Sequence, residues 1–138
     1  MDVATTGMFR LNEFSLHSWD VRVALDQAAT LHPAAVAPLL ERVAPMLAVV
    51  AEPAALAGRG VTVRVTLHEP DRTFGLSLSD SGCTITEPPE APDATLVAPG
   101  EAWLRLVSGR LAPGRTPPAV HVTGSVGLDA LRRVFPGY

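Results

Sequence analysis

The chain has 138 residues, of which 47% are hydrophobic and 18% are charged. This balance predicts one folded domain of ordinary size and excludes a disordered chain. The 11 basic and 14 acidic residues give a formal net charge of -3 without a basic run, which excludes nucleic acid as a partner.

Location is predicted from what the sequence lacks. Residues 1–7 do not show the pattern of a secretion signal, and no uninterrupted apolar run approaches the roughly 18 residues that cross a bilayer. A cytoplasmic protein with no membrane partner is therefore expected. Cys83 is the one cysteine. It follows Ser81 and Gly82 with no base nearby, a setting typical of a small strand residue rather than a reactive thiol.

Two helices are expected first. Apolar side chains recur at steps of three and four between residues 9 and 25, with Thr5 or Thr6 as the cap of this helix. A second helix is expected over residues 33–50, because Pro33 suits a first helical turn and apolar residues repeat at helical intervals after it.

After residue 60 the apolar period changes to strict alternation, which predicts strands. Residues 61–67 and 74–78 and a segment around Cys83 are separated by two turns and predict an antiparallel meander. The proline-rich residues 87–93 form a surface connection. The remaining expected elements are a strand at 94–98, a helix at 100–107, a strand at 119–123 and a helix at 125–135. The fold class is therefore α+β, a mostly antiparallel sheet of about five strands covered by helices and preceded by a long N-terminal helix.

Glu13 and His17 are the strongest candidate site residues, because side chains four apart lie on one helical face and can converge on a metal ion. A solvated pair has the same spacing, and two ligands do not make a tight zinc site. Asp20 is expected to face water rather than the ring. His32, His68 and His121 are the remaining imidazoles, and the spacing selects none of them as a third ligand.

Arg105, Arg110 and Arg115 lie close together in sequence around the late helix. They predict either an anion-binding group or, with greater weight, a solvated basic face.

Four segments carry a family resemblance: residues 9–25 with Asn12-Glu13, His17 and Trp19-Asp20-Val21-Arg22; the hairpin 59–78; the Ser108-Gly109-Arg110 segment; and the ending 131–138. Together they resemble the actinobacterial mycothiol-dependent maleylpyruvate isomerase-like proteins. That family joins a DinB-like, metal-binding helix bundle to a C-terminal domain with a sterol-carrier-like fold. The resemblance implies a remnant of the last bundle helix at residues 1–30 and a sterol-carrier-like domain at 31–138.

The resemblance also implies a site. Glu13 and His17 match a metal-binding pair of the family, whereas its first histidine, on an earlier helix, has no counterpart here. Zinc or another divalent metal and the thiol mycothiol are the implied cofactors. Arg110 is the nearest match to the basic contact that the C-terminal domain supplies to the catalytic centre.

Two functions are expected from this combination. The first is a stand-alone or truncated C-terminal domain that acts as a binding or accessory module with an incomplete metal site and is inactive alone. The alternative is a mycothiol-dependent isomerase or thiol transferase completed by a helix-bundle partner chain. A homodimer through the N-terminal helix is also expected if Phe14, Leu16 and Trp19 lack cover. A third possibility is a carrier of a small apolar ligand, which rests on the fold analogy alone.

Overall fold

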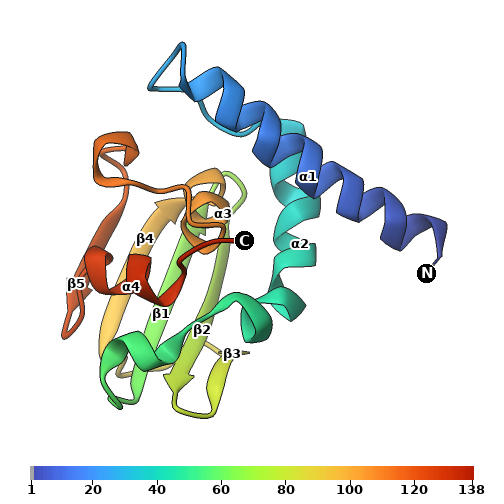
Figure 1. The fold of residues 1–138 in the computed structure, drawn as a ribbon. Helices are drawn as coiled ribbons and strands as arrows, with labels where there is room; N and C mark the ends of the chain where they lie inside the picture. The colour runs from blue at the N-terminus through green and yellow to red at the C-terminus, as the bar shows by residue number, and fades with distance from the viewer. Residues whose placement is uncertain (1) are drawn as a thin grey trace.

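The computed structural model describes residues 2–138, and it begins with the long helix α1, Val3–Val23 (Figure 1). Asp2 caps this helix, since its Oδ1 atom accepts a hydrogen bond of 2.8 Å from the backbone N–H of Thr5. The helix thus begins before the expected apolar pattern, and the prediction of Thr5 or Thr6 as the cap is wrong. The threonines lie in the first turn, where they add hydrogen bonds to the cap residue.

Helix α2, Pro33–Val50, follows a short loop and is capped by His32, whose Nδ1 atom accepts from the backbone N–H of Ala34. Among residues 2–138, α2 is the one helix long and apolar enough to cross a membrane by length and composition. A core helix passes the same test, and Leu39 and Leu47 of α2 are buried in the core. Figure 1 shows α2 between α1 and the rest of the fold.

The sheet has five strands in the order β3-β2-β1-β4-β5. β1 and β4 run parallel, and the other neighbouring strands run antiparallel, so the expected meander β1-β2-β3 and the mostly antiparallel sheet are confirmed. The strands are β1 Val61–His68, β2 Arg72–Ser79, β3 Gly82–Thr86, β4 Ala94–Pro99 and β5 His121–Gly124. The remaining elements are η1 Pro53–Leu56, α3 Gly100–Val107, η2 Pro113–Arg115 and α4 Leu128–Val134.

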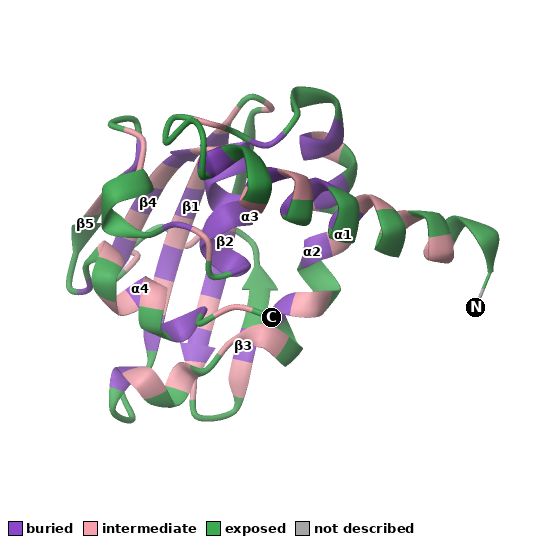
Figure 2. Ribbon diagram, turned by 45° about the horizontal axis from the view of Figure 1, so that its top comes forward, coloured by how far each residue is buried: buried purple, intermediate pink, exposed green. Residues whose placement is uncertain are grey.

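The core lies between one face of the sheet and the helices. Val63 and Val65 of β1 point into it, as the alternation of β1 predicts, and α3 is buried along its whole length. Trp103 of α3 packs edge-on against Phe74 and Phe135, with ring centroids 5.5 and 6.0 Å apart. Figure 2 shows the buried residues gathered on the sheet and α3, while the first half of α1 extends from the body as a mainly exposed rod.

The second half of α1 is covered. Leu16 and Trp19 are only 3% and 2% exposed, and the indole Nε1 atom of Trp19 donates a 2.7 Å hydrogen bond to the Ala29 carbonyl. The condition for self-association through these two side chains is therefore not met, since both are covered; Ala29 in the α1–α2 loop supplies the contact to Trp19. Phe14, at 77% exposed, is the member of that expected group that faces solvent.

Candidate functional site

Three ionisable side chains follow one side of α1. The His17 Nε2 atom lies 3.3 Å from Glu13 Oε2, and the His17 Nδ1 atom lies 3.3 Å from Asp20 Oδ2. Their spacing of four and three residues places them on one side of the helix. The Glu13 and His17 side chains are 60% and 67% exposed, so this row opens to solvent.

Asp20 also forms an ion pair with Arg110, which lies 90 residues later in the chain. The Arg110 Nε and Nη2 atoms donate to the two Asp20 oxygens at 2.9 and 3.0 Å, and Nη1 donates to the Ser108 carbonyl at 3.0 Å. Gly109 precedes Arg110 in the turn that follows α3. Its φ is +72°, and a Cβ there would lie 2.5 Å from the Pro136 carbonyl oxygen, so this turn requires glycine. The expectation that Asp20 faces water is therefore wrong.

The charge of Asp20 is fixed by these contacts. The hydrogen bonds from Arg110 hold the pKa of Asp20 below its ordinary value; partial burial opposes this, and the charge of Arg110 and the contact with His17 add to it. Each ring nitrogen of His17 therefore has a carboxylate oxygen at 3.3 Å, Glu13 Oε2 at Nε2 and Asp20 Oδ2 at Nδ1. His17 is thus oriented by a charged partner rather than by packing.

Tyr138 and Asn12 form the edge of the site nearest the body. The Tyr138 hydroxyl donates to Asn12 Oδ1 at 3.4 Å. Burial raises the pKa of Tyr138; the hydrogen bond to Asn12 and the positive charge of Arg110 oppose this rise, and the negative charge of Glu13 adds to it. The phenol therefore keeps its proton at neutral pH and remains a hydrogen-bond donor beside Glu13.

Glu13 and His17 fit half of a zinc site. Two ligand atoms bound to tetrahedral zinc at about 2.0–2.1 Å lie about 3.3 Å apart, and Glu13 Oε2 and His17 Nε2 have this separation. The Asp20 carboxylate at the other ring nitrogen is the usual outer partner of a zinc-bound histidine. Among residues 2–138, however, no group of three or more His, Cys, Asp or Glu side chains is placed to hold a metal ion. Within the described residues, a third ligand of these types is not in place beside Glu13 and His17.

The other histidines do not supply that donor. The Nδ1 atom of His32 is used in capping α2. His68 ends β1, and His121 begins β5, opposite Val97 of β4. The sequence left all three open as ligands, and the fold keeps them apart from Glu13 and His17 within the described residues.

The three late arginines have separate roles. Arg105 is almost fully buried and forms a two-pronged ion pair with Glu101, at 2.8 Å for each hydrogen bond. Arg110 binds Asp20. The expectation of a common solvated face is therefore wrong for these two, and only Arg115 is exposed. The Glu101–Arg105 pair has the helical spacing of four, whereas the Asp20–Arg110 pair joins residues 90 positions apart and has no local signal.

A second feature is an apolar cavity of about 270 Å³ between α2, the sheet and α3. Phe74 and Trp103 form its inner wall, and Glu41 and Arg72 stand at its edge, 3.6 Å apart.

With this geometry in view, the family can be stated. Residues 46–119, more than half of the chain, match the family described as "SCP-2 sterol transfer family". The chain belongs to this family, and the sterol-carrier-like part of the sequence prediction is confirmed. No curated protein matches the chain.

Solved structures agree on the fold. The sterol carrier protein domain 2 of Helicoverpa armigera superposes with a TM-score of 0.50 at 17% identity, over 70% of this chain and 90% of that one. The inverting sec-alkylsulfatase Pisa1 from Pseudomonas sp. superposes with a TM-score of 0.54 at 13% identity, over 69% of this chain. The match spans only 16% of the sulfatase. Both likenesses show the fold, and a sterol-carrier-like domain is a binding or accessory module.

Proposed function

We propose that this chain is the C-terminal, sterol-carrier-like module of a mycothiol-dependent maleylpyruvate isomerase-like protein, either stand-alone or truncated, and that it supplies half of a metal site. The 3.3 Å separation of Glu13 Oε2 and His17 Nε2 carries this proposal. The other half of the site would come from a helix-bundle partner docked on α1. Without that partner the module is inactive.

The residues around Glu13 and His17 support a site that this chain shares with a partner. Asp20 holds the His17 ring, and Arg110 holds Asp20, so the C-terminal body fixes the ligands that α1 carries. Phe14 and Val21, which flank His17 at three and four residues' distance, are exposed apolar side chains on the same side of the helix. A partner helix would bury them while it adds its ligand.

When bound, zinc with an open position lowers the pKa of a coordinated thiol or water. This chain's own residues would orient and enclose that centre. Arg110 acts as a positioning residue, because its three donor nitrogens are already engaged with Asp20 and Ser108. In the alternative function, a mycothiol-dependent isomerase or thiol transferase, the same residues act in an enzyme completed by the partner chain.

Zinc titration of the purified chain by calorimetry tests the proposal. We expect weak binding that Glu13→Ala or His17→Ala abolishes and that the exposed control Glu90→Ala leaves unchanged. Tight binding of one zinc per chain, controlled by Glu13, would contradict the accessory role and favour a complete enzyme site. Binding that ignores both substitutions would remove the half-site altogether.

Light scattering during the same titration identifies the partner. Zinc-dependent doubling of the mass, at one zinc per two chains, would make a second copy the source of the missing ligands. A monomer that retains weak, Glu13-dependent binding leaves that role to a different, helix-bearing chain.

A second function is favoured by the apolar cavity beside Trp103, which suits a small apolar ligand. Its volume of about 270 Å³ lies just below the range of about 300–1,000 Å³ typical of small-molecule pockets, so a fatty chain fits the proposal better than a bulky ring system. Titration with a fluorescent fatty acid tests it. Leu40→Trp, which fills the cavity from α2, should abolish binding, while the exposed control Val49→Trp should not.

A further inference from the structure

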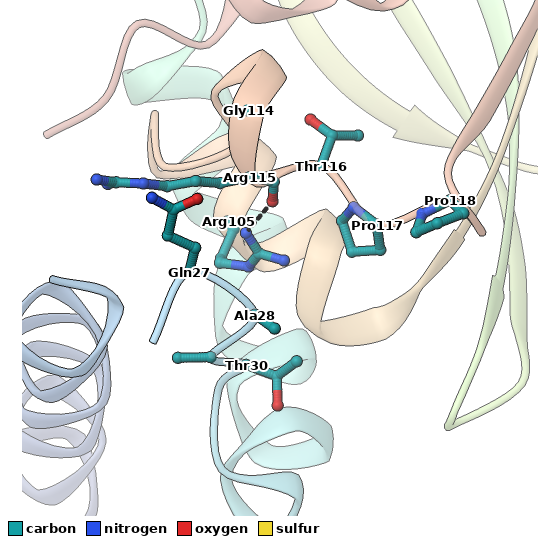
Figure 3. A pocket seen from close by; sticks show the side chains of 10 residues that line it. Gln27, Ala28, Thr30, Arg105, Gly114, Arg115, Thr116, Pro117 and Pro118 are labelled. Atoms are coloured by element: carbon teal, nitrogen blue, oxygen red, sulfur yellow. Dashed lines mark hydrogen bonds between the residues drawn. The ribbon is translucent and has the colours of Figure 1, made fainter. Parts of the chain in front are cut away.

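A second basin lies away from the Glu13–His17 site, where the α1–α2 loop meets the segment that contains η2 (Figure 3). Its volume is about 360 Å³. This is the volume of about a dozen water molecules at ~30 Å³ each. Gln27 and Thr30 line it on the α1–α2 side, and Arg115, Pro117 and Pro118 line it on the other side.

Two of the residues that line the basin, Arg105 and Arg115, lie near the buried ring of Trp19. The Arg105 guanidinium lies 5.1 Å from the centre of the indole ring, and the Arg115 guanidinium lies 6.0 Å from it. Arg105 also donates a 2.8 Å hydrogen bond to the Arg115 carbonyl, which fixes the start of the 115–118 segment. Two cations near one aromatic ring are tolerated because Glu101 neutralises the buried Arg105.

Arg115 differs from Arg105 in having no carboxylate partner. It takes part in none of the ion pairs formed within residues 2–138, and no acidic residue lines the described basin. Its guanidinium therefore keeps its charge and its hydrogen-bond donors available. Figure 3 shows the Gln27 and Arg115 side chains at one side of the basin and the two prolines at the other.

These features suit a ligand that is charged at one end and apolar at the other. A guanidinium donates two parallel hydrogen bonds to a carboxylate, and the amide of Gln27 offers a further donor. The side chains of Ala28, Pro117 and Pro118 offer apolar surface to the rest of the ligand. The geometry points to a binding site for a small organic carboxylate with a flat apolar body, held by Arg115 and Gln27.

The site is independent of the proposed metal half-site, and it gives the chain a further binding function. Because the α1–α2 loop and the 113–118 segment both line it, an occupant would tie α1 to the body at the end opposite Val3.

Titration with benzoate, followed by amide and indole resonances in NMR, tests this site. We expect saturable shifts of the Trp19 indole N–H, whose acceptor Ala29 lines the basin, and of the Gln27 and Thr116 amides. Arg115→Ala should weaken benzoate binding at least about tenfold, because the charged hydrogen bonds are lost. Arg115→Lys should recover part of it, since lysine keeps the charge without the planar fork.

Arg133→Ala, which removes another exposed arginine outside the basin, is the matched control and should bind benzoate like the unchanged chain. Benzamide, with the same ring and no charge, should cause no saturable shift. The site is overturned if benzoate causes no saturable shift of these resonances, if benzamide shifts them equally, or if Arg115→Ala binds benzoate unchanged.

Discussion

The sheet-and-helix body and helix α1 use apolar residues in different ways. In the body, Val63 and Val65 are fully buried and their alternate neighbours face outward. On α1, apolar residues occupy two opposite sides: Leu16 and Trp19 pack against the body, while Phe14 and Val21 face solvent.

The proposed partner would dock where this difference is greatest, on the outer side of α1. An apolar side chain on the outer face of a helix gains nothing from the chain's own core. Phe14 and Val21 flank His17, so this exposed apolar surface and the proposed metal ligands lie on the same side of α1. The body has a core of its own, whereas the proposed partner helix would cover these side chains of α1.

Trp103→Ala gives the largest expected contrast between the two regions. Trp103 is buried against Phe74 and Phe135, and its removal leaves a cavity beneath α3. We expect the free energy of unfolding to fall by about 3–5 kcal/mol, measured by urea denaturation. Phe14→Ala removes an aromatic ring from the exposed side of α1 and should change it by less than about 0.5 kcal/mol. A loss of the same size in both variants would contradict the contrast.

Two glycines give the next contrast. A Cβ at Gly75 in β2 would lie 2.5 Å from the Glu87 carbonyl, because the proline-rich connection crosses the sheet there. Gly75→Ala should cost about 1–3 kcal/mol. Gly7 lies in the exposed half of α1 with open space around it, and Gly7→Ala should stabilise the helix by up to about 1 kcal/mol. Thermal unfolding and helical circular dichroism measure the two effects, and a destabilised Gly7→Ala would show that this half of α1 is packed.

Local patterns explain how much of the fold the sequence predicts. The alternation of β1 and the helical repeat of α2 place both elements correctly, because each pattern depends on a few neighbouring residues. The apolar repeat of α1 places Leu16 and Trp19 on one face, and both are buried, whereas the hydrogen bond from Trp19 to Ala29 in the α1–α2 loop has no local signal. The N-terminal cap at Asp2 was missed because it precedes the apolar repeat.

The site divides in the same way. The contact between Glu13 and His17 follows from a spacing of four on a helix, so it is predictable. The pairing of Asp20 with Arg110 joins residues 90 positions apart, and no local signal marks it. The basin at Arg115 depends on the ion pair that neutralises Arg105 and leaves Arg115 as the available charge.

Arg110→Ala tests the link between the two regions. It leaves the partly buried Asp20 carboxylate without its two charged hydrogen bonds. The Asp20 side chain is 38% exposed, so water compensates in part, and we expect a loss of about 1–2 kcal/mol. Denaturation measures this loss, with Arg133→Ala as the exposed control. If α1 amides exchange hydrogen no faster in Arg110→Ala, the ion pair does not fasten α1 to the body.

The pH dependence of that ion pair is the smallest expected effect. Because hydrogen bonds from Arg110 lower the pKa of Asp20 in the folded chain, the folded state binds fewer protons than the unfolded state around pH 4. The resulting stability is present above the unfolded pKa and is lost as the pH falls through the lower, folded value. Unfolding measured from pH 7 to pH 3 should therefore show a shallower decline for Asp20→Asn than for the unchanged chain, by less than about 1 kcal/mol. Asp93, whose pKa is lowered by hydrogen bonds from Thr62, keeps its own contribution in both proteins, so the difference isolates Asp20. Equal declines would mean that Asp20 titrates alike in the folded and unfolded chains, and that the bond between α1 and the body does not depend on its charge.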